Sequence, residues 1–183
     1  MPVPLSSCKL LVRLGCHSRL TADFVFRGIL LQNSGRLGEA SLAYRAALRY
    51  RPQLAVACLN LGLATAELGS RDEAISILGR CSQLDDNGLK DPRANANARQ
   101  SAVFQQARLR LEGGNAAGAV ALLLKHPHNT PAALNLLGEA HQALGQLHAA
   151  ELCYSRALAL APAHTPATLT LAKMLARNVS KHY

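Results

Sequence analysis

Small and large apolar residues recur along the chain in a pattern that repeats every 34 positions. Residues 21–52 and 55–86 align at this offset, and residues 131–162 form a third copy in the same register. A weaker, shortened copy begins near residue 100, and residues 165–183 match the first half of a further one. A period of this length is typical of an array of helix pairs in which each pair stacks on the next.

Each copy predicts two antiparallel helices joined by a short turn. Small residues at positions 8 and 20 of a copy let the helices approach closely, and larger residues at positions 4, 7, 11 and 24 fill the remaining gaps. A glycine near position 15 ends the first helix, because a left-handed backbone costs a glycine little. The small residues expected to pack between the helices are Gly28, Ala40, Gly62, Ala74, Ala107, Ala119, Gly138 and Ala150.

This spacing resembles the tetratricopeptide repeat (TPR). The likeness rests on Leu-Gly at 61–62 and 137–138, on Tyr44 and Tyr154 at position 24, and on Pro52 and Pro162 near position 32. It implies an all-α fold, a right-handed α-solenoid of about four antiparallel helix pairs plus a terminal half-unit.

The alignment also predicts where the units begin and end. We expect a poorly specified N-terminal extension at 1–20, units at 21–54, 55–88, 100–130 and 131–164, and a half-unit at 165–183. Between the second and third units, the insert at 89–99 contains a proline and two asparagines and is expected to be a loop leading into an early helical turn.

Two units depart from the pattern. Position 7 holds Arg27 in the first unit and Gln106 in the third, where leucine is usual, and position 11 of the third unit is Arg110. We expect these two units to be the least stable parts of the array.

The resemblance implies a concave groove lined by first-helix positions 2, 5, 9, 12 and 13, where an extended or helical peptide binds. These positions could equally be ordinary solvated helix surface. A carboxylate clamp with Lys at position 5 and Asn at position 9 of the first unit is absent, because Val25 and Ile29 stand there. The groove candidates are Val25, Ile29, Gln32, Leu59, Leu63, Phe104, Arg108, Asn135, Glu139, Gln142 and Lys173.

Residues 136–151 carry the groups that a hydrolase or a zinc site would use, namely Glu139, His141, His148 and Glu151. Their positions in the unit put the first pair on one helix and the second pair on the other, so they are not expected to converge on one substrate atom. His126 and His128 form an H-x-H pair without further ligands at a suitable spacing. We therefore predict a non-catalytic chain without a metal or another cofactor.

Charge and cysteine content add little to this interpretation. The net charge is +9, but the basic residues are scattered and no basic helix carries interleaved aromatics, so we do not expect a nucleic-acid partner. The five cysteines are odd in number and contain no C-x-x-C pair. The sequence has no run of 18 apolar residues, so no membrane span is expected.

A second resemblance is finer. Residues 81–109, with their Gly-Leu-Lys-Asp-Pro-Arg linker, and residues 49–62 are similar to the C-terminal repeat region of the transmembrane, TPR-containing protein O-mannosyltransferases. This likeness implies the lumenal repeat portion of an endoplasmic-reticulum enzyme that uses dolichyl-phosphate-mannose and modifies Ser and Thr of cadherin-type proteins. Asn178-Val179-Ser180 matches the glycosylation sequon, in keeping with a lumenal setting. The alternative is a stand-alone cytoplasmic TPR adaptor or scaffold.

Overall fold

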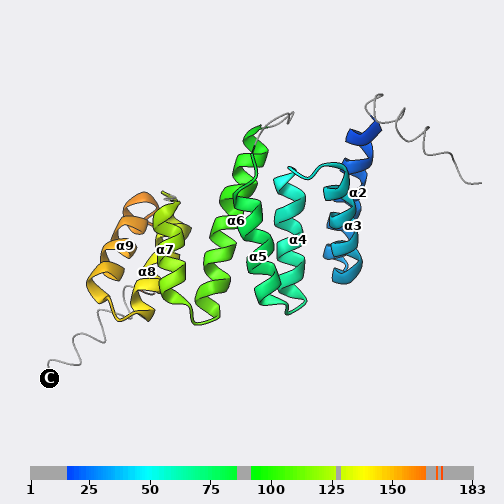
Figure 1. The fold of residues 1–183 in the computed structure, drawn as a ribbon. Coiled ribbons are helices and arrows are strands. Elements are labelled where there is room, and N and C mark those ends of the chain that lie inside the picture. Colours follow the sequence, from blue (N-terminus) through cyan, green and yellow to red (C-terminus); the bar gives the residue numbers. More distant parts are fainter. Residues whose placement is uncertain (1–15, 86–91, 127–128, 164–167, 169, 171–183) are drawn as a thin grey trace, which may run out of the picture. The chain divides into compact units, whose positions relative to one another are not determined.

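A computed structural model of the chain describes residues 16–85, 92–126, 129–163, 168 and 170. These residues form eight helices and no strand, which confirms the predicted all-α class. Within each compact body of the chain, the paired helices run antiparallel, as in the repeats of an α-solenoid (Figure 1). In chain order they are α2 (Cys16–Asn33), α3 (Leu37–Tyr50), α4 (Ala55–Glu67), α5 (Arg71–Ser82), α6 (Pro92–Glu112), α7 (Ala116–Lys125), α8 (Pro131–Ala143) and α9 (Leu147–Leu160).

The chain forms two compact bodies, an N-terminal body up to Ala102 and a C-terminal body from Val103. The division falls within α6, so each body contains part of that helix. The two bodies are described separately below.

The same hydrogen-bonded turn joins the helices of every pair. In each turn a backbone N–H donates to the carbonyl oxygen five residues earlier, as Arg36 does to Leu31 over 2.9 Å and Gln146 to His141 over 2.9 Å. This is the Schellman motif, which satisfies carbonyls at the end of the first helix. Gly35, Gly69, Gly114 and Gly145 occupy its left-handed position, with φ between 74° and 88°.

In the N-terminal body, α2 pairs with α3 and α4 pairs with α5, and α3 also packs against α4. The buried side chains come from one stripe of each helix, as the 3.6-residue period requires. Ala40, Tyr44 and Ala47 supply the stripe of α3, whereas Ala74, Ile77, Leu78 and Cys81 supply that of α5.

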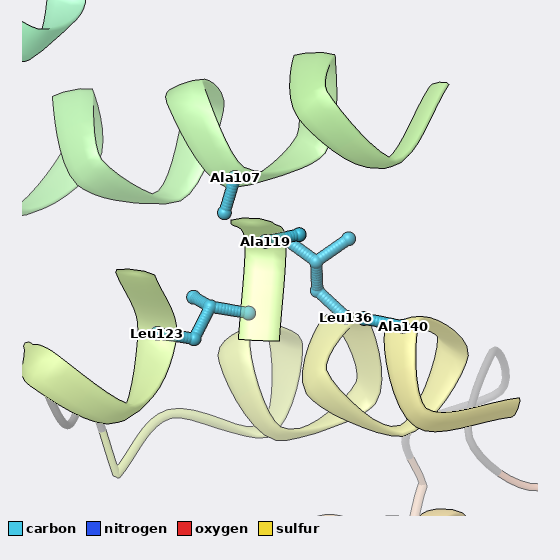
Figure 2. Packing of buried hydrophobic residues seen from close by; sticks show 5 residues of the cluster. All are labelled: Ala107, Ala119, Leu123, Leu136 and Ala140. Carbon is cyan, nitrogen blue, oxygen red and sulfur yellow. The ribbon is translucent and has the colours of Figure 1, made fainter. Parts of the chain in front are cut away.

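The C-terminal body has an aliphatic core in which alanines from three helices meet two leucines. Figure 2 shows Ala107 of α6 and Ala119 of α7 beside Leu123, Leu136 and Ala140. Alanines at these points bring the helix backbones close together, and partly buried hydrophobic side chains such as Phe104 and Leu137 pack around the cluster.

Helix α6 takes up more of the insert than the single early helical turn that was expected. Helix α6 begins at Pro92, so residues 92–99 of the insert are helical. Proline is favoured at the first position of a helix, where its missing N–H is not needed. Asn95 is 2% exposed, and its Oδ1 accepts a 2.7 Å hydrogen bond from the backbone N–H of Ala55 at the start of α4. The side chain therefore fixes this helical extension to the preceding helix pair.

All eight small residues expected between the helices are buried. Three of them are glycines covered by the side chain at position 24 of the same pair. A Cβ atom at Gly62 would lie 2.7 Å from Leu78 Cδ2, and one at Gly28 would overlap the ring of Tyr44. The close approach of these helices therefore requires glycine at these positions.

Candidate functional site

The groove candidates lie on the first helices of the pairs, in two separate sets. Helices α2 and α4 carry the set in the N-terminal body, and the end of α6 with α8 carries the set in the C-terminal body. Lys173 lies outside the described residues.

On the N-terminal body, the groove candidates include half-buried apolar side chains and a series of hydrogen-bonded polar side chains. Leu59 and Leu63 of α4 are half-buried, as is Val25 of α2, whereas Ile29 is exposed. This surface therefore combines apolar area with polar groups whose orientation is fixed.

Two hydrogen bonds link three polar side chains, one each from α2, α3 and α4. The hydroxyl of Tyr44 donates to Gln32 Oε1 over 2.9 Å, and Gln32 Nε2 donates to Glu67 Oε1 over 3.0 Å. Burial, and secondarily the charge of Glu67, raises the pKa of Tyr44, so the phenol stays protonated and remains a donor. Each donor thus orients the next side chain.

The C-terminal body repeats part of this arrangement. The hydroxyl of Tyr154 donates to Gln142 Oε1 over 3.0 Å, and Asn135 Nδ2 donates to Glu139 Oε1 over 2.7 Å. Burial is the main cause that raises the pKa of Tyr154, and the nearby carboxylate of Glu139 adds to it. Asn135 is 7% exposed, and its Oδ1 has no hydrogen-bond partner among the described residues.

The end of α6 adds one apolar and two charged groups to the C-terminal body. Phe104 is half-buried and packs against the core cluster, while Arg108 is exposed and lies 3.6 Å from Glu112. An exposed ion pair one turn apart on a helix is weak, so both groups remain available to a ligand.

The two tyrosine hydroxyls were not expected to reach the groove candidates. The sequence marks Tyr44 and Tyr154 as packing residues at position 24. Each ring does cover a glycine, but its hydroxyl extends to the glutamine twelve residues earlier. The signal that could have found this contact is the recurrence of Gln at position 12 together with Tyr at position 24.

The four polar residues singled out in residues 136–151 lie on two helices, as predicted. Glu139 accepts from Asn135, whereas His141 Nδ1 lies 2.6 Å from Gln146 Oε1 in the turn after α8. His148 and Glu151 belong to α9, where the first is exposed and the second is half-buried. Among the described residues, no three His, Cys, Asp or Glu side chains group as metal ligands would. His128 lies outside the described residues.

Family comparison identifies the helix pairs. The tetratricopeptide-repeat family matches residues 55–87, which form α4 and α5, and residues 131–164, which include α8 and α9. These two segments are tetratricopeptide repeats.

The sequence is also similar to curated TPR-containing enzymes. It is 36% identical over 114 residues to the protein O-mannosyl-transferase TMTC2 of Mus musculus, and 35% identical over 111 residues to TMTC2 of Homo sapiens. These matches cover 59% and 57% of this chain but only 14% and 13% of the relatives. The similarity therefore concerns a small part of those enzymes, and this chain resembles their repeat region.

Solved structures agree on the fold. MamA from Desulfovibrio magneticus RS-1 matches 87% of this chain and 85% of its own with a TM-score of 0.69 at 18% identity. YrrB, described as a TPR protein with an unusual peptide-binding site, matches 85% of this chain and 76% of its own with a TM-score of 0.62 at 16% identity. Within the described residues, no helix has the length and apolar character needed to cross a membrane.

Proposed function

We propose that this chain is a non-catalytic protein-binding module that holds peptide segments on the first-helix faces of its TPR units. The observation that carries the proposal is the chain of hydrogen bonds from Tyr44 through Gln32 to Glu67, beside the half-buried Leu59 and Leu63. Apolar area supplies affinity, and polar groups held in fixed positions supply specificity.

The polar groups on these faces indicate the ligand's chemistry. A carboxylate has lone pairs for about four hydrogen bonds, so Glu67 and Glu139 retain capacity beyond the contacts described above. Asn135 Nδ2 already donates to Glu139 and so holds this carboxylate in place on the C-terminal face. Acceptors of this kind favour a peptide that offers backbone N–H groups or basic side chains.

A screen for bound proteins tests the proposal on each body. Leu63→Glu places a charge on the N-terminal face and Phe104→Glu places one on the C-terminal face, so each should release the partners that bind there. Leu152→Glu on α9 is the matched control, because Leu152 is exposed and belongs to a second helix rather than a first helix. If every captured partner survives both face substitutions, the first-helix faces are not the binding site.

We further propose that the module serves a protein O-mannosyltransferase system of the endoplasmic reticulum. The similarity to the TMTC2 enzymes supports this setting, although it covers 13% to 14% of their length. In such a system the mannose of dolichyl-phosphate-mannose would be transferred by a membrane-embedded catalytic part. The module would contact the Ser- and Thr-containing acceptor, such as a cadherin-type protein.

Occupancy of the sequon at Asn178 distinguishes the two compartments. A lumenal chain should carry a glycan that endoglycosidase removes, and Asn178→Gln should abolish the resulting mass shift. Protection of the chain from protease in intact microsomes provides an independent readout. An unglycosylated chain that protease digests without detergent would support the cytoplasmic adaptor instead.

A further inference from the structure

The α4–α5 pair buries two cysteines that the candidate binding faces do not use. Cys58 of α4 is 3% exposed and Cys81 of α5 is 0% exposed. Both are free thiols in this structure. Buried thiols usually act as small apolar groups, so the chemistry open to this pair depends on whether the two sulfur atoms can reach each other.

Each thiol reaches the backbone of the other helix. Cys58 Sγ donates to the carbonyl oxygen of Ile77 over 3.6 Å, and Cys81 Sγ donates to that of Ala55 over 3.3 Å. In a helix, a side chain lies over the turn that precedes its own Cα atom. The side chain of Cys81 therefore lies over the turn that begins at Ile77, beside the carbonyl that Cys58 reaches. The two sulfur atoms meet between α4 and α5.

The repeat brings the same two positions together in another helix pair. Cys58 and Cys81 stand at positions 4 and 27 of their unit, where the last pair has Leu134 and Ala157. Leu134 and Ala157 pack together in a core cluster. The second unit is the only one with cysteine at both positions, so a helix spacing that elsewhere buries a leucine against an alanine here brings two thiols together.

The surroundings of the pair distinguish the two thiols. Hydrogen bonding with Cys81 lowers the pKa of Cys58, and the positive charge of Arg80 adds to this effect. The same hydrogen bonding, together with burial, raises the pKa of Cys81. The thiolate is the form that attacks a disulfide, so Cys58 is the nucleophile of the pair and Cys81 keeps its proton longer.

The pair lies at the end of the helix hairpin opposite the Gly69 turn. Cys58 is in the first turn of α4, and Cys81 is followed by the last residue of α5, Ser82. Terminal helical turns open more readily than helix interiors, so a small reagent can reach the sulfur atoms without unfolding of the whole body. A covalent bond here would join the two helix ends that the turn leaves apart.

We propose that Cys58 and Cys81 form a disulfide when the chain meets a small-molecule disulfide such as oxidised glutathione. The Cys58 thiolate attacks one sulfur of the reagent, whose S–S bond breaks and releases one small thiolate. Cys81 then gives up its proton and attacks the Cys58 sulfur of the mixed disulfide, which releases the second small thiolate. The protein dithiol thus loses two electrons and two protons, and the reagent becomes two thiols. This oxidation is independent of peptide binding on either face.

Refolding of the reduced full chain tests the bond without limiting the access of the reagent. The chain refolds with equal concentrations of reduced and oxidised glutathione, free thiols are blocked with N-ethylmaleimide, and trypsin digests the protein without reduction. Trypsin leaves Cys58 in residues 50–71 and Cys81 in residues 81–90, so a linked pair of these peptides identifies the bond by mass. We expect the linked pair in most refolded chains. Recovery of both peptides as blocked thiols, or of Cys58 linked mainly to another cysteine, would overturn the proposal.

Urea unfolding of the oxidised and reduced chains tests whether the fold holds the thiols at bonding distance. A crosslink that closes the loop 58–81 without strain restricts the unfolded chain, so oxidation should raise the folded-to-unfolded ratio by about a hundredfold. Cys58→Leu and Cys81→Ala copy Leu134 and Ala157 of the last pair, so both variants should fold.

Each of these variants should reduce the redox dependence of stability to within about twofold, whereas Cys153→Ala, a half-buried cysteine of α9, should leave it intact. Circular dichroism confirms that each variant is folded. A bond that forms but leaves stability unchanged or lowers it would overturn the proposal, as would a redox dependence that survives in Cys81→Ala.

Discussion

The ring of Tyr154 lies directly against Gly138, so that a Cβ atom on the glycine would be 2.5 Å from Tyr Cε1. The tyrosine is fully buried, and its hydroxyl is fixed by Gln142 one turn further along α8. The ring therefore has no free direction in which to move. One residue pair sets both the separation of α8 and α9 and the orientation of a side chain on the candidate binding face.

Replacing this glycine should destabilise the protein. Gly138→Ala forces the ring of Tyr154 and a new methyl group into the same space, which costs about 1–3 kcal/mol in the free energy of unfolding. Urea unfolding measures the change. Gly38→Ala is the control, because nothing lies within 4 Å of a Cβ there and alanine should gain up to about 1 kcal/mol in a helix.

A second substitution should rescue the first. The third unit already combines Ala107 at position 8 with Leu123 at position 24, and both pack in one core cluster. The double variant Gly138→Ala with Tyr154→Leu copies this pair, so it should recover much of the stability lost by Gly138→Ala alone. If the two substitutions instead cost the sum of their separate effects, the ring is not the source of the clash.

The contribution of the Tyr154 hydroxyl to stability should depend on pH. Tyr154→Phe removes the hydrogen bond to Gln142 and should cost about 0.5–1.5 kcal/mol at neutral pH. Because burial raises the pKa of Tyr154, the unfolded chain ionises first above about pH 10, and the wild type loses stability as pH rises through that range. The Phe variant lacks this loss, so the stability gap between the two proteins should shrink.

Urea unfolding at about pH 8 and about pH 11 measures the gap. Absorbance of the phenolate gives a second readout, because Phe substitution at Tyr154 should remove a component that ionises late in the titration. A gap that stays constant between the two pH values would contradict the raised pKa.

Asn95 should be more important for stability than its neighbour two residues on. Asn95→Ala leaves the N–H of Ala55 buried without its acceptor, which costs about 1–3 kcal/mol. Asn97→Ala is the matched control, because Asn97 is exposed in the same turn of α6 and should change stability by less than about 0.5 kcal/mol. Amide exchange at Ala55 should accelerate only in the Asn95 variant; equal acceleration in both would show that the hydrogen bond of Asn95 is not the cause.

The units with unusual residues at position 7 should open first. Arg27 is exposed in the first unit, where leucine is usual, and Gln106 brings a polar group into the core of the third. Hydrogen exchange should therefore be faster in α2, α3 and α7 than in α4 and α5. Uniform protection across all these helices would show that the substitutions at position 7 are fully compensated.

The repeat period predicts helices well because it reflects packing between neighbours. The packing role of Gly62 and Ala74 can be predicted from spacing alone, because small side chains at these positions let the two helices approach closely. The start of α6 could not be assigned in this way. The sequence there is polar, and its position depends on a long-range hydrogen bond that the Ala55 N–H donates to Asn95 Oδ1, which no local pattern contains.

The binding faces were predictable only in outline. Position in the repeat placed Gln32 and Glu139 on first helices, but the partners that orient them depend on side-chain reach across helices.

The turns between paired helices also have a chiral consequence. Gly35, Gly69, Gly114 and Gly145 each adopt φ between 74° and 88° with open space where a side chain would stand. At these sites glycine stands in for a residue of the opposite hand. D-Ala introduced by chemical ligation would fit all four without strain and would restrict the unfolded chain, so it should stabilise each turn by about 0.4–1 kcal/mol, whereas L-Ala should destabilise it. Four turns between right-handed helices thus each contain a glycine in the backbone conformation that D-residues prefer.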